Sequence, residues 1–231
     1  MNKIAVVADI HANIHALNLF LEYLSKENID QVINLGDFLQ LGPNPLETVR
    51  IVLSDNRFLN ILGNKEMSLI NRNPEELART EVEHQDWVID QIGPENMELI
   101  KQIPVERVIR FANNSFLAVH SRRDKLADLP LIYTGGKIED FVHDYGETTE
   151  YVLIGHTHLQ ALISYWDGKP VLNPGSLGCG KDGFARFAVI AADEDTMTFS
   201  FIQRKYDKNR VVTELIEKNV PNHQKIIKRF Y

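Results

Sequence analysis

The chain has 231 residues, of which 44% are hydrophobic and 25% charged, and its formal net charge is −7 at pH 7. This length fits one α/β domain, and the composition excludes the disordered and membrane-spanning classes of protein. The acidic balance disfavours a general nucleic-acid binder, because phosphate backbones attract basic surfaces. The single cysteine, Cys179, excludes an internal disulfide, and the apolar run before Asp9 is too short for a signal peptide, so we expect a cytoplasmic protein with no membrane attachment.

The chain opens with a predicted buried strand that ends in two potential metal ligands. Residues Lys3–Ala8 are almost all apolar, which is typical of a strand buried on both faces, and Asp9 and His11 follow directly. Apolar residues at helical spacing then predict a helix over Ile14–Lys26, with Asn13 as its N-cap. Asp9 and His11 are therefore expected at the carboxyl edge of a sheet, where open α/β proteins place their sites.

The next two apolar runs repeat this arrangement. Gln31–Leu35 ends in Gly36-Asp37 and precedes a predicted helix near Leu46–Ser54. Arg57–Leu62 ends in Gly63-Asn64. Three polar clusters at the carboxyl ends of successive strands are hard to assign to chance, so we expect them to form one site.

Residues 66–104 interrupt this alternation and form a predicted helical insertion. Pro74 after Asn73 is typical of a helix start, and Pro94 opens another predicted helix. We expect the insertion to be a lid or simply an outer layer, and the pattern does not choose between them. His84 is expected on the surface rather than as a ligand.

A hairpin of Val105–Phe111 and Ser115–His120 is predicted next. Its second strand ends in His120, which is another potential ligand. Arg122 and Arg123 follow, and they are weak candidates for phosphate contacts because guanidinium groups pair well with phosphate.

A helix is predicted over Gly136–Tyr145, and the apolar run Tyr151–Ile154 follows it as a strand. This strand ends in Gly155 and then in two histidines one residue apart. In extended backbone the rings of His156 and His158 would leave on the same side of the chain. Because neutral imidazole is the commonest metal ligand, the pair can serve one ion or two neighbouring ones.

The rest of the chain adds strands and an amphipathic tail, and no linker or repeat divides residues 1–231, so we predict a single domain. Asn13 and Ser176 are weak candidates for phosphate contacts. Residues 207–231 are predicted to form one or two helices broken at Pro221. The remaining predicted strands are Gln160–Trp166, Lys169–Leu172, Phe184–Ala192 and Met197–Lys205.

The candidate ligands at predicted strand ends are all nitrogen or oxygen donors: Asp9, His11, Asp37, Asn64, His120, His156 and His158. Such mixed ligands suit Mn²⁺, Fe²⁺, Zn²⁺ or Co²⁺, and the absence of thiolates from the set argues against a structural zinc site. One four-coordinate ion cannot use seven ligands, whereas two ions that share a bridging carboxylate can. Two ions about 4 Å apart are the usual device for hydrolysing phosphate esters.

These motifs in this order resemble the calcineurin-like metallophosphoesterase family, and most of all its small single-domain prokaryotic phosphoesterase branch. The resemblance implies a four-layer α/β/β/α sandwich with two central mixed β-sheets. It runs from Ile4 to about Pro221 and includes Asp9-x-His11, Gly36-Asp37, Gly63-Asn64-x-Glu66, the strand-end His120 and Gly155-His156-Thr157-His158.

The resemblance also implies a binuclear, metal-dependent phosphoric ester hydrolase, with a phosphodiesterase favoured. The implied ligands are Asp9, His11 and His158 for the first ion, Asn64, His120 and His156 for the second, and Asp37 as a bridging and catalytic carboxylate. The two ions would be Mn, Fe, Zn, Co or Ni, with Mn favoured, and a hydroxide between them would attack phosphorus in line. The expected substrate is a small phosphate ester or nucleotide.

Lys65 departs from the family pattern, which usually has a histidine there as general acid. A lysine ammonium is a weaker acid than an imidazolium. We predict that Lys65 is catalytic, either by binding a phosphate oxygen or by stabilising the leaving group. The alternative is that Lys65 faces solvent and that another group, or water, supplies the proton.

Two other functions belong to different classes. One is a catalytically weak scaffold of the same fold that binds a protein partner; such relatives tend to lose metal ligands, and none is missing here. The other is a metal-dependent amidohydrolase, which is disfavoured because its His-x-His pair follows the first strand of a (βα)₈ barrel rather than a late strand. Dinucleoside polyphosphates, cyclic nucleotides and phosphoproteins all remain open as substrates, and so does assembly into a homo-oligomer.

Overall fold

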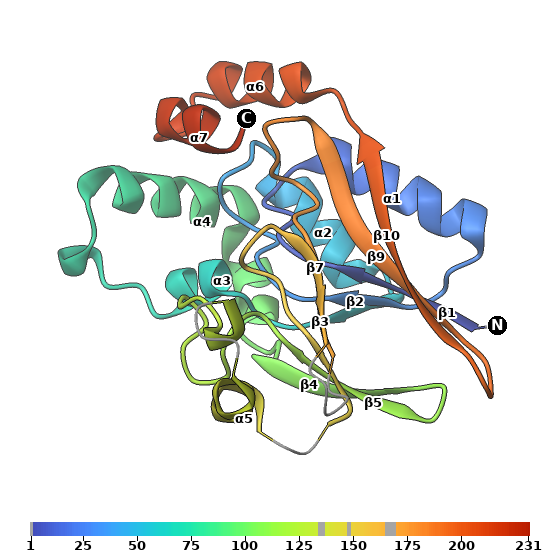
Figure 1. Cartoon of the computed structure of the whole chain (residues 1–231). Coiled ribbons are helices and arrows are strands. Elements are labelled where there is room, and N and C mark those ends of the chain that lie inside the picture. The colour runs from blue at the N-terminus through green and yellow to red at the C-terminus, as the bar shows by residue number, and fades with distance from the viewer. Residues whose placement is uncertain (1, 134–136, 147–148, 165–169) are drawn as a thin grey trace.

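Two five-stranded β-sheets pack face to face at the centre of the computed structural model, which describes residues 2–133, 137–146, 149–164 and 170–231 (Figure 1). The first sheet has the order β10-β9-β1-β2-β3, in which β1, β2 and β3 are parallel. The second has the order β4-β5-β6-β8-β7, in which β5, β6 and β8 are parallel. The strands are β1 (Asn2–Val7), β2 (Val32–Asn34), β3 (Phe58–Asn60), β4 (Glu106–Phe111), β5 (Asn114–Val119), β6 (Tyr151–Leu153), β7 (Gln160–Ile163), β8 (Val171–Pro174), β9 (Phe184–Ala192) and β10 (Met197–Lys205).

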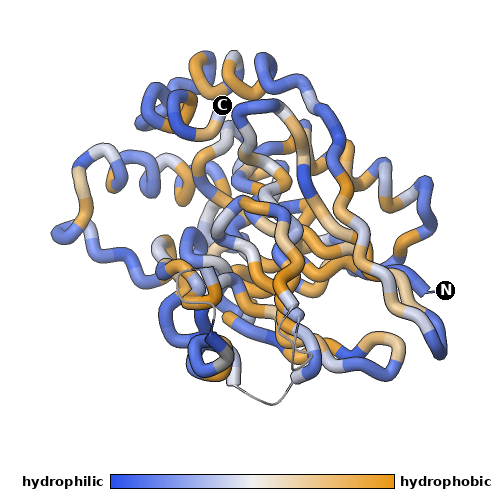
Figure 2. Tube along the Cα trace, viewed as in Figure 1, coloured by the Kyte–Doolittle hydropathy of each residue, from blue (hydrophilic) through white to orange (hydrophobic). Residues whose placement is uncertain are grey.

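Alternating side chains of the central strands build two separate apolar layers. In β1, Ala5 and Val7 pack against helices, whereas Ile4 and Val6 pack against the second sheet. This alternation explains why the first predicted strand is almost wholly apolar, because both of its faces are buried. Figure 2 shows hydrophobic residues concentrated along these strands.

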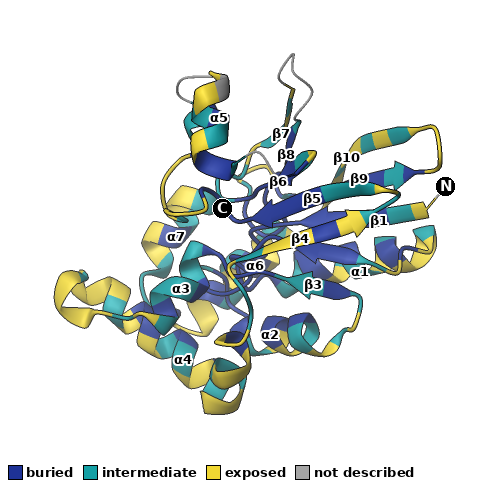
Figure 3. Cartoon of the chain, turned by 90° about the horizontal axis from the view of Figure 1, so that it is seen from below, coloured by how far each residue is buried: buried dark blue, intermediate teal, exposed yellow. Residues whose placement is uncertain are grey.

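Helices cover the outer faces of both sheets, which confirms the predicted four-layer α/β/β/α sandwich. Helices α1, α2, α4, α6 and α7 share an apolar core with the first sheet, and α5 and η2 share one with the second. Figure 3 shows the central strand β5 mostly buried, whereas the edge strand β4 is largely exposed. The helices are α1 (Ile14–Glu27), α2 (Pro45–Ser54), α3 (Asn64–Ile70), η1 (Pro74–Glu76), α4 (Arg79–Ile100), η2 (Leu131–Tyr133), α5 (Ile138–Tyr145), α6 (Lys208–Glu217) and α7 (His223–Phe230).

The helical insertion packs as part of the outer layer. Val88, Ile92 and Ile100 are buried in the core that also contains α1 and α2. The turn at Pro74 is a short 3-10 helix rather than the start of a long helix, and α4 kinks at Gly93, where φ is 76°, just before Pro94. Whether any part of residues 66–104 moves as a lid stays a prediction.

The expected surface position of His84 is wrong. Its side chain is buried, its Nδ1 donates to the carbonyl of Pro221 at 3.1 Å, and its Nε2 accepts from the amide of Leu41 at 3.1 Å. Burial lowers the pKa of His84 to about 4, so the ring is neutral at pH 7. His84 therefore ties α4 to two distant segments and is not a ligand.

The remaining boundaries follow the predictions closely. The tail forms α6 and α7, and the break between them includes Pro221. Helix α5 begins at Ile138, and Gly136, Trp166 and Lys169 of the predicted elements lie outside the described residues. In the part of the chain that the structure describes, no helix combines the length and apolar character needed to cross a membrane.

Candidate metal centre

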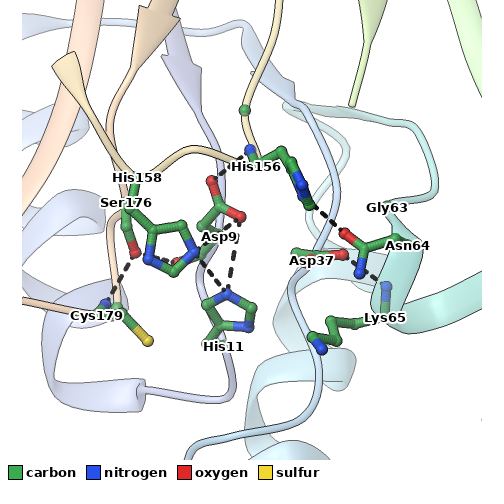
Figure 4. A network of polar contacts seen from close by, with 12 residues as sticks. Asp9, His11, Asp37, Gly63, Asn64, Lys65, His156, His158, Ser176 and Cys179 are labelled. Carbon is green, nitrogen blue, oxygen red and sulfur yellow. Dashed lines mark hydrogen bonds and ion pairs between the residues drawn. The ribbon is translucent and has the colours of Figure 1, made fainter. Parts of the chain in front are cut away.

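The candidate ligands come together where loops leave the carboxyl ends of parallel strands (Figure 4). Backbone hydrogen bonds tie these loops to one another, because the amide of Asp9 donates to Gly36 at 3.0 Å and that of His11 donates to Asp37 at 3.0 Å. The amide of Gly155 likewise donates to the carbonyl of His120 at 2.9 Å. Main-chain contacts therefore hold the ligand loops of each sheet together, and the amide of His156 joins the two sheets by donating to Oδ2 of Asp9 at 3.0 Å.

Five of the candidate ligands have left-handed backbone conformations, which residues other than glycine seldom adopt. Such conformations cost about 1–2 kcal/mol each and concentrate at functional sites, where the surrounding structure enforces them. The φ angles are 55° at Asp9, 48° at His11, 55° at Asp37, 67° at His156 and 61° at His158.

This geometry corrects the expectation of extended backbone at the paired histidines. Because both residues turn, the two rings do not leave side by side. His158 approaches His11, whereas His156 approaches Asn64, and Asp9 lies between the two histidines in Figure 4. The pair therefore contributes to two different groups of ligands.

Glycines at two strand ends allow the loops to approach this closely. A Cβ atom on Gly63 would lie 2.1 Å from Oδ1 of Asp37, and one on Gly155 would lie 2.7 Å from the Cβ of Ala8. Any larger residue would push the ligand loops apart, so the glycines in the Gly-Asn and Gly-His motifs have a steric role.

The first group contains Asp9, His11 and His158. The Nε2 atoms of the two histidines are 3.2 Å apart, and Oδ1 of Asp9 lies 3.7 Å from the first and 3.4 Å from the second. That oxygen is buried and has no hydrogen-bond partner among the described residues. Nδ1 of His11 donates to the carbonyl of Leu39 at 3.4 Å, which leaves the Nε2 lone pair facing the group.

The second group contains Asn64, His120 and His156. Oδ1 of Asn64 lies 3.0 Å from Nε2 of His120 and 3.0 Å from Nδ1 of His156. Nδ1 of His120 donates to the carbonyl of Leu35 at 2.7 Å, so its Nε2 also faces inward. Oδ1 of Asn64 can only accept, so in neutral His120, which carries its proton on Nδ1, the Nε2 lone pair would face another acceptor.

Asp37 lies between the two groups. Its Oδ1 accepts from the amide of Lys65 at 2.8 Å, and its Oδ2 lies 3.4 Å from Nε2 of His120. Asp9, Asp37 and His120 offer ligand atoms that all lie within 4.8 Å of one another. This position fits the bridging carboxylate that the resemblance implies.

The buried carboxylates give the centre a negative potential. Burial alone lowers the pKa of His120, but the Asp37 charge outweighs it and raises that pKa to about 9. Burial lowers the pKa of His11 to about 4, which keeps that ring neutral and its lone pair available. A centre that draws a proton onto His120 would also attract a divalent cation.

Glu66 supports the centre, and the residue pattern had given it no role. The buried carboxylate accepts from the amides of Asp37 at 2.8 Å, Leu39 at 2.9 Å and Gly63 at 3.0 Å. It therefore joins the two loops that carry Asp37 and Asn64. Burial, and then the charge of Asp37, raise its pKa to about 7, while the backbone donors oppose that shift. The sequence signal that could have identified Glu66 was its position in the Gly63-Asn64-x-Glu66 motif.

Cys179 lies beside the first group. Its Sγ and the ring nitrogens of His11 and His158 all lie within 4.8 Å of one another. Burial raises the pKa of this thiol, so it is neutral at pH 7 and behaves as a packed side chain.

The four weak candidates for phosphate contacts all have protein partners. Asn13 caps α1 and donates to the carbonyl of Gly178 at 2.8 Å, and Ser176 donates to the backbone oxygen of Asp9 at 2.9 Å. Arg122 pairs with Asp144 at 2.9 Å and Arg123 with Glu106 at 2.6 Å. None of the four lines the cavity described next. As substrate contacts they stay predictions that this packing does not support.

A cavity of about 550 Å³ opens over the centre. One wall contains candidate ligands, and the other comes from α3, α4 and α7. Its volume lies in the range of small-molecule sites. The lining residues are His11, Asp37, Gln40, Leu41, Asn64, Lys65, Ser68, Leu77, Glu81, His84, Gln85, His156, Thr157, His158, Asn222, Lys225, Ile226, Arg229 and Phe230.

Comparison with known proteins supports the fold of the chain. An uncharacterized protein of Methanocaldococcus jannaschii is 23% identical over 237 residues, covering 95% of this chain and 94% of the relative. A solved metallophosphoesterase of Sphaerobacter thermophilus superposes with a TM-score of 0.73 and 21% identity, with 98% of each chain covered. A solved protein of Pyrococcus horikoshii superposes with a TM-score of 0.76 and 22% identity, covering 99% of this chain and 97% of the other.

The family model described as the calcineurin-like phosphoesterase superfamily domain matches residues 2–195. This range contains every candidate ligand and every strand of both central sheets except β10. The chain therefore belongs to the calcineurin-like phosphoesterase superfamily.

Proposed function

We propose that the protein hydrolyses phosphodiester or nucleotide-type phosphate bonds with two divalent metal ions, of which Mn²⁺ is favoured. The observation that carries this proposal is Oδ1 of Asp9, which is buried, has no hydrogen-bond partner among the described residues and faces two histidine nitrogens. Leaving a charged oxygen unpaired in the interior costs several kcal/mol. A cation between Asp9, His11 and His158 removes that cost.

The donor set supports a second ion beside the first. Asn64, His120 and His156 would hold it, and Asp37 would reach both ions. When bound, such ions polarise phosphoryl oxygens and activate water at neutral pH. Neutral imidazole and carboxylate are suitable ligands for Mn²⁺ and for the other metals considered.

The residues of the chain itself orient the phosphate group. The backbone amide of Lys65 fixes Asp37, and its side chain lines the cavity. Burial is the main cause of the lowered pKa values of His11 and His84, and the positive charge of Lys65 is close enough to both rings to add to that lowering. From there it is positioned to bind a phosphate oxygen or to stabilise a leaving group.

The test is hydrolysis of bis-p-nitrophenyl phosphate and p-nitrophenyl phosphate with Mn²⁺ and then with a chelator. We expect turnover that requires the metal, prefers the diester and disappears in Asp37→Ala. Asp193→Ala, in the exposed turn after β9, is the matched control and should behave like the wild type.

The opposite result would point to another class of function. If the protein binds two ions, as measured by elemental analysis, and yet hydrolyses neither ester with any divalent metal, the general phosphodiesterase is excluded. A narrow substrate or a scaffold of the same fold that binds a protein partner would then explain the centre better.

A further inference from the structure

Three cations line the cavity together with the candidate ligands. Lys65 comes from α3, and Lys225 and Arg229 come from α7. Lys225 and Arg229 are four positions apart, so they lie on the same face of their helix. Among the residues that the structure describes, none forms an ion pair with any of these three.

The net charge of this wall favours an anion. Among the described residues, Glu81 is the one acidic side chain that α3, α4 and α7 add to the lining, against the three cations. Like charges around a cavity repel one another, and the potential that they create attracts anionic ligands. The three cations therefore have too little negative charge beside them on this wall. A ligand with several negative groups would supply it.

Helix α7 is held in place at both ends. Before it, the carbonyl of Pro221 accepts from the buried His84 at 3.1 Å. After it, the hydroxyl of the buried Tyr231 donates to Gly178 at 3.0 Å, and the backbone oxygen of Tyr231 accepts from Lys208 at 2.9 Å. Ile226 anchors its middle in the apolar core. The wall is thus a fixed part of the fold, beside α6 in Figure 1.

The end of α7 reaches the metal centre itself. The ring of Phe230 lies 5.9 Å from that of His158 and 6.4 Å from that of His11. The guanidinium of Arg229 lies 5.2 Å from the centre of the Phe230 ring. A cation is therefore held next to the point where the reacting phosphate would lie.

We propose that Lys225 and Arg229 bind a second anionic group of the substrate, which makes the substrate a phosphate ester or anhydride with at least two phosphate-type groups, such as a nucleoside diphosphate. This inference rests on the proposed function, because it assumes that one phosphate lies at the metal centre. The next phosphate then lies toward α7, and the cavity volume leaves room for a nucleoside.

The test compares two nucleotides that differ by one phosphate group. Calorimetry on the Mn²⁺-loaded protein measures binding of adenosine monophosphate and of the methylene-bridged analogue of adenosine diphosphate, which is not hydrolysed between its phosphates. We expect the wild type to prefer the diphosphate analogue by about tenfold, the size expected for added charge-assisted contacts. The double variant Lys225→Ala/Arg229→Ala should lose most of this preference.

Two matched variants separate charge from structure. Lys228→Ala removes an exposed cation from the same helix outside the cavity lining and should keep the preference. Lys225→Arg/Arg229→Lys retains both charges and should keep it within about threefold, with thermal unfolding as the check on folding. Equal binding of both nucleotides by the wild type, an unchanged preference in the double alanine variant, or its loss in either matched variant would overturn the proposal.

Turnover of bis-p-nitrophenyl phosphate by the wild type is measured in parallel, because this substrate carries only one phosphate group. Turnover without a nucleotide preference would leave the proposed function standing and remove the second anion site. A nucleotide preference without turnover would exclude the general phosphodiesterase and leave the second anion site standing.

Discussion

The two walls of the cavity are built in opposite ways. The metal-centre wall comes from loops that each follow a strand, and Asp9, His11 and His120 are 1% exposed or less. The other wall comes from helices, and Lys225 and Arg229 are exposed on it. The metal-centre wall thus combines buried charged groups with left-handed backbone, whereas the helical wall carries solvent-exposed charges.

This difference separates two kinds of mutational effect. Removing a buried polar group leaves its partners without hydrogen bonds, so both folding and metal binding suffer. Removing a solvated cation leaves the fold nearly unchanged and alters only what a ligand meets. The predictions below test this division from the largest expected effect to the smallest.

The largest effect is expected for Glu66→Ala. Three buried backbone amides lose their acceptor, so the free energy of unfolding in chelator should fall by about 3 kcal/mol. Metal affinity should fall by about 10–100-fold, because Glu66 orients the loops that carry Asp37 and Asn64. Urea titration and metal-binding calorimetry measure the two effects. Glu76→Ala, on the exposed η1, is the control, and equal stability of the two variants would contradict the role given to Glu66.

The metal-centre wall could be predicted because its residues follow their strands directly. Parallel strands bring their carboxyl ends to one edge, so a polar cluster after each apolar run already implies a shared site. Local sequence could not show the left-handed turns at His156 and His158, since neither residue is a glycine and the loops from the other strands impose the conformation. The sequence therefore could not predict the directions in which the rings of His156 and His158 point.

The helical wall could not be predicted because its members are distant in sequence. Lys225 and Arg229 look like the solvated face of an ordinary amphipathic helix until α7 is placed against the cavity. The burial of His84 likewise depends on Pro221, far along the chain. Arg122 and Arg123 are the converse case: they follow a ligand in sequence, and the fold pairs them with Asp144 and Glu106, which the local sequence does not show.

His84 joins the two walls, and its titration should make the fold sensitive to acid. Its pKa is about 4 in the folded protein against an ordinary value of 6.5, because burial disfavours the charged ring. The unfolded chain therefore binds the proton more tightly, and stability is lost as the pH falls from 6.5 toward 4. Between pH 7 and pH 5 the contribution of this group is about 2 kcal/mol.

The measurement is urea unfolding in chelator at both pH values, in the wild type and in His84→Gln. The variant should lose about 2 kcal/mol less than the wild type on acidification. His143→Gln, on the exposed side of α5, should retain the full dependence. Equal pH dependence in the wild type and His84→Gln would mean that His84 is not buried in its neutral form.

Lys65 stands where the two walls meet, so its removal should affect chemistry more than stability. We expect Lys65→Ala to lower kcat by about tenfold for diesters with poor leaving groups, and less for p-nitrophenyl esters, because only the former need help at the leaving oxygen. Lys65→Arg retains the charge and should recover part of the loss. Unchanged kcat on both kinds of ester would end the catalytic interpretation and leave Lys65 as a solvent-facing residue.

The smallest effect is expected for Arg123→Ala, and this variant sets the two basic regions against each other. The side chains of Arg123 and Glu106 are 42% and 33% exposed, so their ion pair contributes at most about 1 kcal/mol to stability. Because the guanidinium already has a carboxylate partner and lies outside the cavity lining, kcat/KM for bis-p-nitrophenyl phosphate should stay within about twofold of the wild type. A tenfold loss of kcat/KM with the fold intact would mean that substrate draws Arg123 away from Glu106. The residues that follow His120 in sequence would then matter more than those that α7 brings to the cavity.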